Sequence, residues 1–210
     1  MRQGIVQKTF NNPTPGAELT YVDKPDAAGE YIYRIVPYNS AGQGGVVEAT
    51  VNVGAPGKSV PYVEDFSSAD RWENELVFID ANNDGTCFWH ATSTTPPYAW
   101  VHNNGKDGTT FDDYLITPGI ELKEGDTYKI SADAYGYGHN MSILIGSAPK
   151  IADLTNNVKT ETLGEDWVNY SGEFVAPYTG KFYIGIRDFA EAGKALSDFH
   201  VANIRLDRIG

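Results

Sequence analysis

Cysteine, basic side chains and long apolar runs are all scarce in this chain of 210 residues. Cys87 is the single cysteine, so no disulfide can form within the chain. Zinc sites made of four cysteines, or of two cysteines and two histidines, are excluded for the same reason. No stretch approaches the ~18 apolar residues of a membrane-spanning helix. Residues 1–10 lack the apolar centre of a signal peptide, so we expect an export signal on a longer precursor, or a cytosolic chain.

Basic residues are outnumbered, with 16 Lys and Arg against 28 Asp and Glu, which gives a formal net charge of -12 and a pI of about 4.6. Nucleic acids attract positively charged surfaces, so we expect no nucleic-acid partner. Anionic membranes are disfavoured on the same grounds, and we expect no membrane insertion. The negative charge suits divalent cations and equally suits a solvated surface.

Catalytic motifs are also missing from the sequence. It contains no G-x-S-x-G, no P-loop and no H-E-x-x-H, and its four histidines lack metal-ligand spacing. Asp112 and Asp113 are adjacent, and neighbouring residues of a strand face opposite sides, so they do not form a converging acid and base pair. Cys87 and His90, three residues apart, would also face opposite sides. The sequence therefore predicts no catalytic residues and no enzyme activity.

Aromatic residues and turn formers are plentiful: 13 Tyr, 9 Phe and 4 Trp stand beside 22 Gly and 11 Pro. Residues 127–134 alternate between apolar and polar side chains, which is typical of a half-buried strand. Only residues 149–154 suggest a short helix. Many short strands separated by turns predict an all-β fold, a β-sandwich or jelly roll. The predicted strands are 4–10, 18–22, 31–37, 46–53, 76–79, 114–117, 127–134, 142–145, 170–175, 181–187 and 201–206.

A domain boundary is predicted at Gly54–Lys58, which reads GAPGK, and divides the chain into residues 1–56 and 57–210. In the first part, the spacing of Tyr33, Ile35, Pro37, Asn39 and Gly42 resembles the late strands of fibronectin type III domains. A complete sandwich of that type needs roughly 100 residues. We therefore expect a partial fibronectin type III-like sandwich, whose usual role is that of a spacer. The alternative is a β-appendage that packs on the main domain.

The second part carries a series of motifs in a fixed order. They are VEDF at 63–66, Trp72, DANNDG at 80–85 leading to Trp89, DDYLITP at 112–118, and a last strand at 201–206. In this order they resemble the cleaved-adhesin domains of gingipains and haemagglutinins, and the related choice-of-anchor J domains of Bacteroidetes surface proteins. The resemblance implies a jelly-roll β-sandwich. It differs at Ala202–Asn203–Ile204, where family members tend to carry two Asp before the Ile, so a cation site that uses those carboxylates is weakened or lost.

The resemblance also implies a function. Family members are extracellular or cell-surface modules, associated with the outer membrane, and are linked to adhesion and matrix binding, often with calcium. We therefore expect a non-catalytic adhesin-type module, monomeric within a larger multidomain protein, that recognises a host extracellular protein or glycan. The alternative is a carbohydrate-binding module appended to a secreted hydrolase or protease.

The acidic loop suggests a calcium site. Asp80, Asn82 and Asp84 stand at the first, third and fifth positions of a calcium loop, with Gly85 at the sixth for the sharp turn. The Thr86 carbonyl is a further ligand candidate. Position twelve is Ala91 rather than Glu, so this is no EF-hand, and calcium needs about six to eight oxygens. The remaining acid is expected from Asp112 or Asp113, and next from Glu64 or Asp65. The alternative is an Asx-rich turn whose side chains cap their own backbone.

Four aromatic residues are candidates for ligand contact. Tyr98 and Trp100 follow Pro96–Pro97, and Tyr135 and Tyr137 lie in a Gly-rich turn. Aromatic rings stack on sugar faces or anchor protein partners. We predict contact through rings at the sandwich edges rather than through a deep pocket. The alternative is that these rings pack in the core or in turns.

Overall fold

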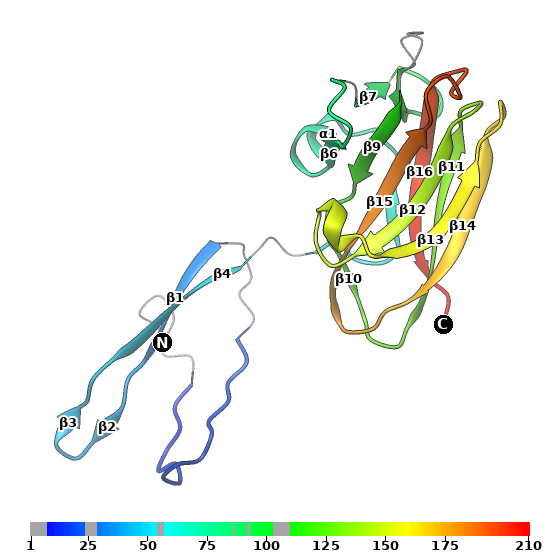
Figure 1. Ribbon diagram of the computed structural model, residues 1–210. Helices are drawn as coiled ribbons and strands as arrows, with labels where there is room; N and C mark the ends of the chain where they lie inside the picture. Colours follow the sequence, from blue (N-terminus) through cyan, green and yellow to red (C-terminus); the bar gives the residue numbers. More distant parts are fainter. Residues whose placement is uncertain (1–7, 24–28, 54–56, 86, 92, 103–109) are drawn as a thin grey trace. The chain divides into compact units, whose positions relative to one another are not determined.

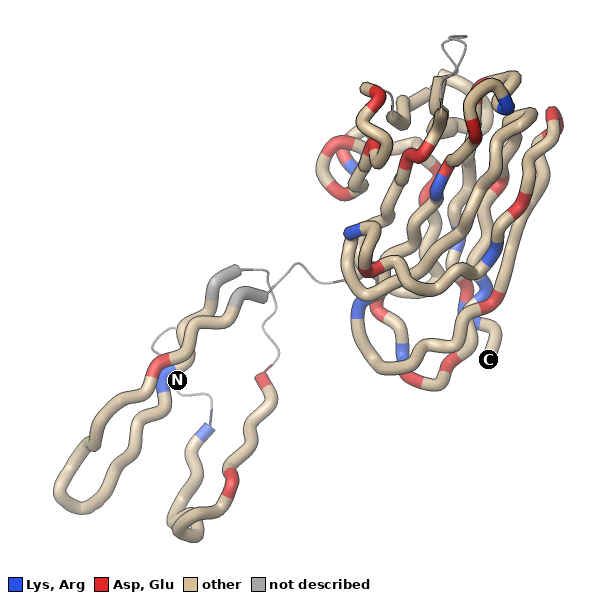
Figure 2. Tube along the Cα trace, viewed as in Figure 1, with Lys and Arg blue, Asp and Glu red and all other residues tan. Residues whose placement is uncertain are grey.

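The computed structural model describes residues 8–23, 29–53, 57–85, 87–91, 93–102 and 110–210. The chain divides into two compact units, residues 1–56 and 57–210, and each is described by itself. Acidic positions are spread over the second unit and are interspersed with fewer basic ones (Figure 2). Within the described residues, no helix combines the length and the apolar character needed to cross a membrane.

The first unit is built on a hairpin of two long antiparallel strands, with a smaller hairpin at its tip (Figure 1). Tyr31 is buried, whereas Ile35 and Val47, which pair across the hairpin, are largely exposed. The predicted strand at 18–22 is wrong, since these residues are irregular. Residues 8–10 of the strand predicted at 4–10 are irregular too, and the rest of it lies outside the described residues. The strands of the first unit are β1 Gly29–Ile35, β2 Tyr38–Asn39, β3 Gly42–Gln43 and β4 Val47–Val53. The fibronectin-like identity of this unit stays a prediction.

The second unit is a sandwich of two six-stranded sheets. Sheet one has the order β13-β12-β15-β9-β6, with β10 also paired to β15, and sheet two has the order β14-β11-β16-β8-β7, with β5 also paired to β16 (Figure 1). The strands of sheet one are β6 Val77–Asp80, β9 Phe111–Ile116, β10 Ile120–Leu122, β12 Asn140–Gly146, β13 Asn156–Thr162 and β15 Gly180–Ala190. Those of sheet two are β5 Tyr62–Glu64, β7 Phe88–Ala91, β8 Tyr98–Val101, β11 Thr127–Tyr135, β14 Val168–Val175 and β16 Phe199–Arg208.

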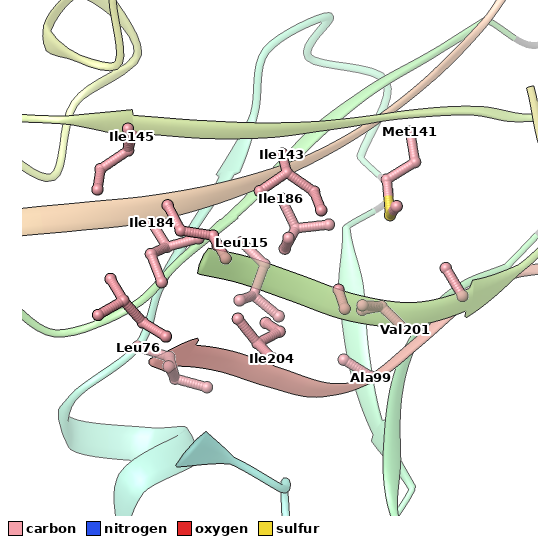
Figure 3. Packing of buried hydrophobic residues seen from close by; sticks show 14 of the residues in the cluster. Leu76, Ala99, Leu115, Met141, Ile143, Ile145, Ile184, Ile186, Val201 and Ile204 are labelled. Carbon is pink, nitrogen blue, oxygen red and sulfur yellow. The ribbon is translucent and has the colours of Figure 1, made fainter. Parts of the chain in front are cut away.

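The core lies between the two sheets, where apolar side chains from both meet (Figure 3). Leu115, Ile143 and Ile184 enter it from sheet one, and Val201 and Ile204 enter it from sheet two; none of these side chains is exposed to solvent. Burying a side chain of this size stabilises the fold by roughly 1.5–3 kcal/mol. The predicted all-β jelly-roll sandwich is confirmed.

Two short helical segments accompany the sheets. The helix α1, Ala69–Asn74, was not predicted. The Ser68 hydroxyl caps it by accepting a hydrogen bond from the backbone N–H of Arg71 at 3.2 Å. Trp72 of α1 stacks on His90 of β7, with ring centroids 4.4 Å apart. The predicted helical segment at 149–154 contains a single 3-10 turn, η1, Ile151–Asp153.

Candidate functional site

Five rings form a row across sheet two, which we call the aromatic row: Trp89, Trp100, His200, Tyr135 and Trp167. Trp89 is the register partner of Trp100, Trp100 of His200, and His200 of Tyr135. Trp167 immediately precedes β14 and contacts Tyr135. Residues that are directly opposite in neighbouring strands share a face of the sheet. The row therefore runs across the strands, and at about 4.8 Å per strand it spans about 19 Å.

The row lies on the outward face of sheet two because its members alternate with core residues. Trp100 stands between Ala99 and Val101, which are fully buried in the core. His200 stands between Phe199 and Val201 in the same way. Since successive side chains of a strand point to opposite faces, the rings face away from the core.

Four of the five rings pack in sequence, whereas Trp89 is aligned with Trp100 by strand register alone. His200 stacks on Tyr135 with ring centroids 4.2 Å apart and an interplanar angle of 6°, and its centroid lies 6.2 Å from that of Trp100 at 15°. Tyr98 meets His200 edge-on at 4.9 Å. Trp89 and Trp167 at the ends are 61% and 41% exposed. Mutual packing fixes the ring planes, so the face is pre-organised for a flat, partly apolar ligand.

His200 is the centre of the row and is 8% exposed. Its burial lowers the pKa of the imidazole below the ordinary value, although the backbone oxygen of Asp198, 3.2 Å from Nδ1, and the charge of Asp198 act in the opposite direction. The charge of His139 adds to the lowering. The ring in the middle of the row is therefore neutral at pH 7.

The predicted ligand-binding residues are placed differently from what the turn signals indicated. Tyr98 and Trp100 lie in β8 and Tyr135 is the last residue of β11, so three of the four stand on strands rather than in loops. Tyr137 lies in the turn after β11 and is 47% exposed. Trp89, Trp167 and His200 were not among the predicted ligand-binding residues. The alternation of Tyr98, Ala99, Trp100 and Val101 is the signal that could have placed β8.

The acidic loop follows β6 and is held by its own side chains. Oδ1 of Asp80 accepts a hydrogen bond from the N–H of Asp84 at 3.2 Å, and Oδ2 accepts one from the N–H of Gly85 at 2.9 Å. The Nδ2 group of Asn82 donates to the Thr110 carbonyl at 2.8 Å. Gly85 has a φ of 85°, which a glycine adopts without steric cost. These bonds form the Asx-rich turn considered as the alternative. Thr86 lies outside the described residues.

The two neighbouring aspartates of β9 face opposite sides. Asp112 pairs with Arg187, with Nε and Oδ1 2.6 Å apart, on the outward face of sheet one. Asp113 points into the sandwich and is fully buried, and its register partners are Asp80 on β6 and Asp188 on β15. Of the two first candidates for the missing acid, the structure therefore brings Asp113 and not Asp112 toward the loop.

Acidic side chains surround the buried Asp113, and one of them, Asp188, is buried as well. Burial raises the pKa of Asp113 to about 8, and the charges of Asp188, Asp84 and Asp80 contribute in the same direction. Asp188 accepts a hydrogen bond from Nδ1 of His139 at 2.7 Å, and Nε2 of His139 lies 2.8 Å from the carbonyl of Ser197. The Ser197 carbonyl can only accept, so Nε2 of His139 carries a proton. Its pairing with Asp188 raises the pKa of His139 despite the opposing effect of burial.

Several buried oxygens beside the acidic loop are poorly supplied with hydrogen-bond donors in the described part of the protein. Oδ2 of Asp188 and Oδ1 of Asn82 have no partner, and Asp113 has the weak thiol donor of Cys87. Hard oxygens of this kind are the ligands that calcium prefers. No three His, Cys, Asp or Glu side chains of the described residues are already gathered around one ion position. The group fits calcium by the nature of its oxygens, and binding requires the loop side chains to converge.

The second candidates for the missing acid belong to a separate network. Glu64 is buried and accepts a hydrogen bond from the N–H of Phe66 at 2.9 Å, and the Arg71 guanidinium lies 3.5 Å from it. Asp65 pairs with Arg71 at 3.0 Å and accepts from Ser67. Arg71 supplies the positive charge at this position.

Comparison with known proteins supports the fold. No family model and no curated protein matches the chain. Among solved structures, the chain is similar to the K1 cleaved adhesin domain of Lys-gingipain from Porphyromonas gingivalis W83, with 18% identity and a TM-score of 0.54, over 72% of this chain and 99% of that domain. The K2 cleaved adhesin domain of Lys-gingipain is similar at 16% identity and a TM-score of 0.53, over 72% of this chain and 99% of that domain. The K3 cleaved adhesin domain, from the same strain as K1, is similar at 15% identity and a TM-score of 0.51, over 70% of this chain and 96% of that domain. The predicted resemblance to cleaved adhesin domains is confirmed at the level of the fold.

Proposed function

We propose that this chain is a non-catalytic binding module of a secreted or cell-surface protein, and that it binds a glycan on the outward face of sheet two. The observation that carries the proposal is the aromatic row. Its central rings are stacked and its end rings are exposed, in a line across five strands. Sugars present apolar C–H faces bordered by hydroxyls, and aromatic rings supply the matching apolar surface for such ligands.

The dimensions of the row favour an extended glycan over a single terminal sugar. A row of about 19 Å offers stacking positions to several successive sugar units. Contacts at successive positions each add binding free energy, and no deep pocket is needed. The affinity should therefore rise with the length of the oligosaccharide. A host extracellular protein is the second candidate ligand, since exposed Trp and Tyr side chains also anchor protein partners. The module acts as a monomer within a larger multidomain protein.

A glycan array and a pull-down with extracellular matrix proteins distinguish the two ligands. We expect glycan hits that are lost in Trp100→Ala and Tyr135→Ala. The control variant is Tyr38→Ala, which removes a 69% exposed ring from the first unit. Matrix-protein binding that depends on Trp100, without glycan hits, would assign the face to a protein partner. Binding that survives both substitutions would show that the row is not the site.

A calcium ion held beside the acidic loop is the second part of the proposal. Asn82 and Asp188 supply buried oxygens that have no hydrogen-bond partner in the described residues, and Asp113 adds two oxygens beside the weak thiol donor of Cys87. Asp80 and Asp84 add negative charge around Asp113. A bound calcium ion would neutralise these carboxylates and fix the segment between β6 and β7. Asn203 of β16 donates a hydrogen bond to Asp133 at 2.8 Å, so the proposed ion does not use β16.

A further inference from the structure

Three polar side chains meet beside the aromatic row, and we call them the polar triad: Asp133 of β11, Asn169 of β14 and Asn203 of β16. The Nδ2 group of Asn169 donates a hydrogen bond to Oδ1 of Asp133 at 2.7 Å. The Nδ2 group of Asn203 donates to Oδ2 of the same carboxylate at 2.8 Å. One carboxylate thus holds two amides from the strands on either side of it.

The polar triad shares the face of the aromatic row. Asp133 stands two residues before Tyr135 on β11, and Asn169 stands two residues after Trp167. Residues two apart in a strand point to the same side and are separated by about 7 Å. Asn169 is exposed, and Asp133 and Asn203 are half-buried. A ligand lying on the rings therefore reaches the triad with its edge.

A bulge in β16 places Asn203 on this face. The register between β11 and β16 shifts between Ser131 and Asp133, so that β16 contains one extra residue there. Asn203 has a φ of 49°, in the left-handed region, and asparagine is among the few non-glycine residues that tolerate it. Bulges of this kind re-aim a side chain and occur next to functional sites. Here the bulge turns an amide outward beside the rings.

The triad retains hydrogen-bonding capacity. Each amide uses one N–H on Asp133, which leaves its second N–H and its carbonyl oxygen for a ligand. The Asp133 carboxylate accepts one bond at each oxygen and has further lone pairs. Adjacent sugar hydroxyls are both donors and acceptors, so they match an amide, a carboxylate and a second amide in a line.

The triad itself carries a negative charge. Asp133 is a member of the triad. A second carboxylate, Asp198, lies near the aromatic row, with its Oδ1 atom 3.1 Å from Nδ1 of His102. Lys129 and Arg205 lie on the side of the triad away from the row, and Arg205 is 3.6 Å from Asp207. A carboxylate or sulfate on the ligand would meet Asp133 at close range and be repelled.

We propose that the polar triad is the hydroxyl-binding part of the glycan site and that it selects uncharged sugars. This inference rests on the proposed function. Asn169 and Asn203 contact the sugar hydroxyls directly. Asp133 holds both amides in position and accepts from a hydroxyl between them.

The test uses the full chain and titration calorimetry. The neutral probes are hexasaccharides of β-linked glucose, xylose and mannose, and the anionic probes are 3′-sialyllactose and a heparin hexasaccharide. The variants are Asn169→Ala, Asn203→Gly and Trp100→Ala. Glycine at position 203 removes the amide and accepts the left-handed backbone. The melting temperature of each variant is measured alongside its affinity.

We expect at least one neutral hexasaccharide to bind and the anionic probes not to bind. Asn169→Ala and Asn203→Gly should each weaken binding about tenfold, the usual effect of losing a hydrogen-bond partner, with little change in melting temperature. If Trp100→Ala abolishes binding while both amide variants bind normally, the polar triad only joins strands and the inference is wrong. A preference for the anionic probes would overturn it as well. If no saccharide binds the unmodified chain, the proposed function itself fails.

Discussion

The Nη1 atom of Arg71 in α1 lies 3.5 Å from Oε2 of Glu64 in β5, a side chain that is 1% exposed. Burial raises the pKa of Glu64, and the hydrogen bond from Phe66 and the charge of Arg71 act against that effect. The pair ties the helix to sheet two. In this pair, the positive charge beside the buried carboxylate comes from the Arg71 side chain rather than from a metal ion.

Arg71→Ala should therefore lower the free energy of unfolding by about 2 kcal/mol, because Glu64 remains buried without a positive partner. Urea denaturation measures the change. The matched control is Arg71→Ala combined with Glu64→Gln, which removes the buried charge and should recover part of the loss. Equal losses in the single and double variants would show that Arg71 acts through packing alone.

Calcium should stabilise the second unit through Asp113. After treatment with EDTA, millimolar calcium should raise the melting temperature. A free calcium concentration of 100 times the Kd would increase the free energy of unfolding by about 2.7 kcal/mol. Asp113→Asn should abolish the calcium effect and should be more stable than the unmodified chain without calcium, because folding no longer has to protonate or bury a carboxylate whose pKa is raised to about 8.

The control for this experiment is Asp112→Asn, which changes the adjacent side chain on the opposite face of β9. It should respond to calcium like the unmodified chain. Calorimetry that detects no calcium heat, or a response that survives Asp113→Asn, would leave residues 80–85 as an ordinary Asx turn.

The pH dependence of stability should carry a contribution from His200. Its pKa is lowered on folding, so the unfolded chain takes up a proton more readily. This contribution to stability is present above the unfolded pKa of about 6.5 and is lost as the pH falls below it. The groups that face His200 are Tyr98, Tyr135 and Asp198, with His139 acting at longer range.

The measurement compares the free energy of unfolding of the unmodified chain and His200→Gln at pH 7.5 and pH 5. The variant should be less stable than the unmodified chain at both pH values. The difference in the free energy of unfolding should be smaller at pH 5, since glutamine does not titrate. A gap that is constant or widens toward pH 5 would contradict a lowered pKa.

The second unit should fold without the first. Its core cluster is composed of residues from position 60 onward, and Lys58 is the first residue with backbone hydrogen bonds into it, to Gly119 and Glu121. Deletion of residues 1–56 should leave the melting temperature of the second unit unchanged in calorimetry. Deletion of residues 1–66 removes β5 with Tyr62 and Phe66, and should unfold it or lower the melting temperature sharply.

The sequence predicted the strands whose apolar residues alternate or cluster. In β11, Tyr128, Ile130, Ala132 and Ala134 are buried as their period of two requires. The motifs around 80–85 and 112–118 predicted the fold through their order. By contrast, β13 reads NNVKTET, lies at the edge of sheet one and lacks an apolar face. Its pairing with β12 could therefore not be predicted from hydrophobic alternation.

The candidate site was only partly predictable because it depends on register. Tyr98, Trp100 and Tyr135 were recognised as candidates, but the row also needs Trp89, His200 and Trp167, which join it through pairing between strands distant in the chain. Asp112 or Asp113 was predicted beside the loop, and the alternation of β9 decides for Asp113, whereas Asp188 and His139 approach it through β15 and the turn before β12. The bulge at Asn203 depends on how β16 pairs with β11, which no local pattern encodes.

The position of β16 has a consequence for how the proposed binding face forms during synthesis. This strand is the last of its unit in chain order, yet it lies in the middle of sheet two, paired with β11, β8 and β5. While the ribosome is still producing residues 199–208, β11 and β14 can pair, but β7 and β8 have no strand that links them to β11. The rings and the polar triad therefore come together only after these last residues emerge. A nascent chain stalled before residue 199 should expose the edges of β8 and β11 to chaperones, and it should bind no ligand until translation resumes.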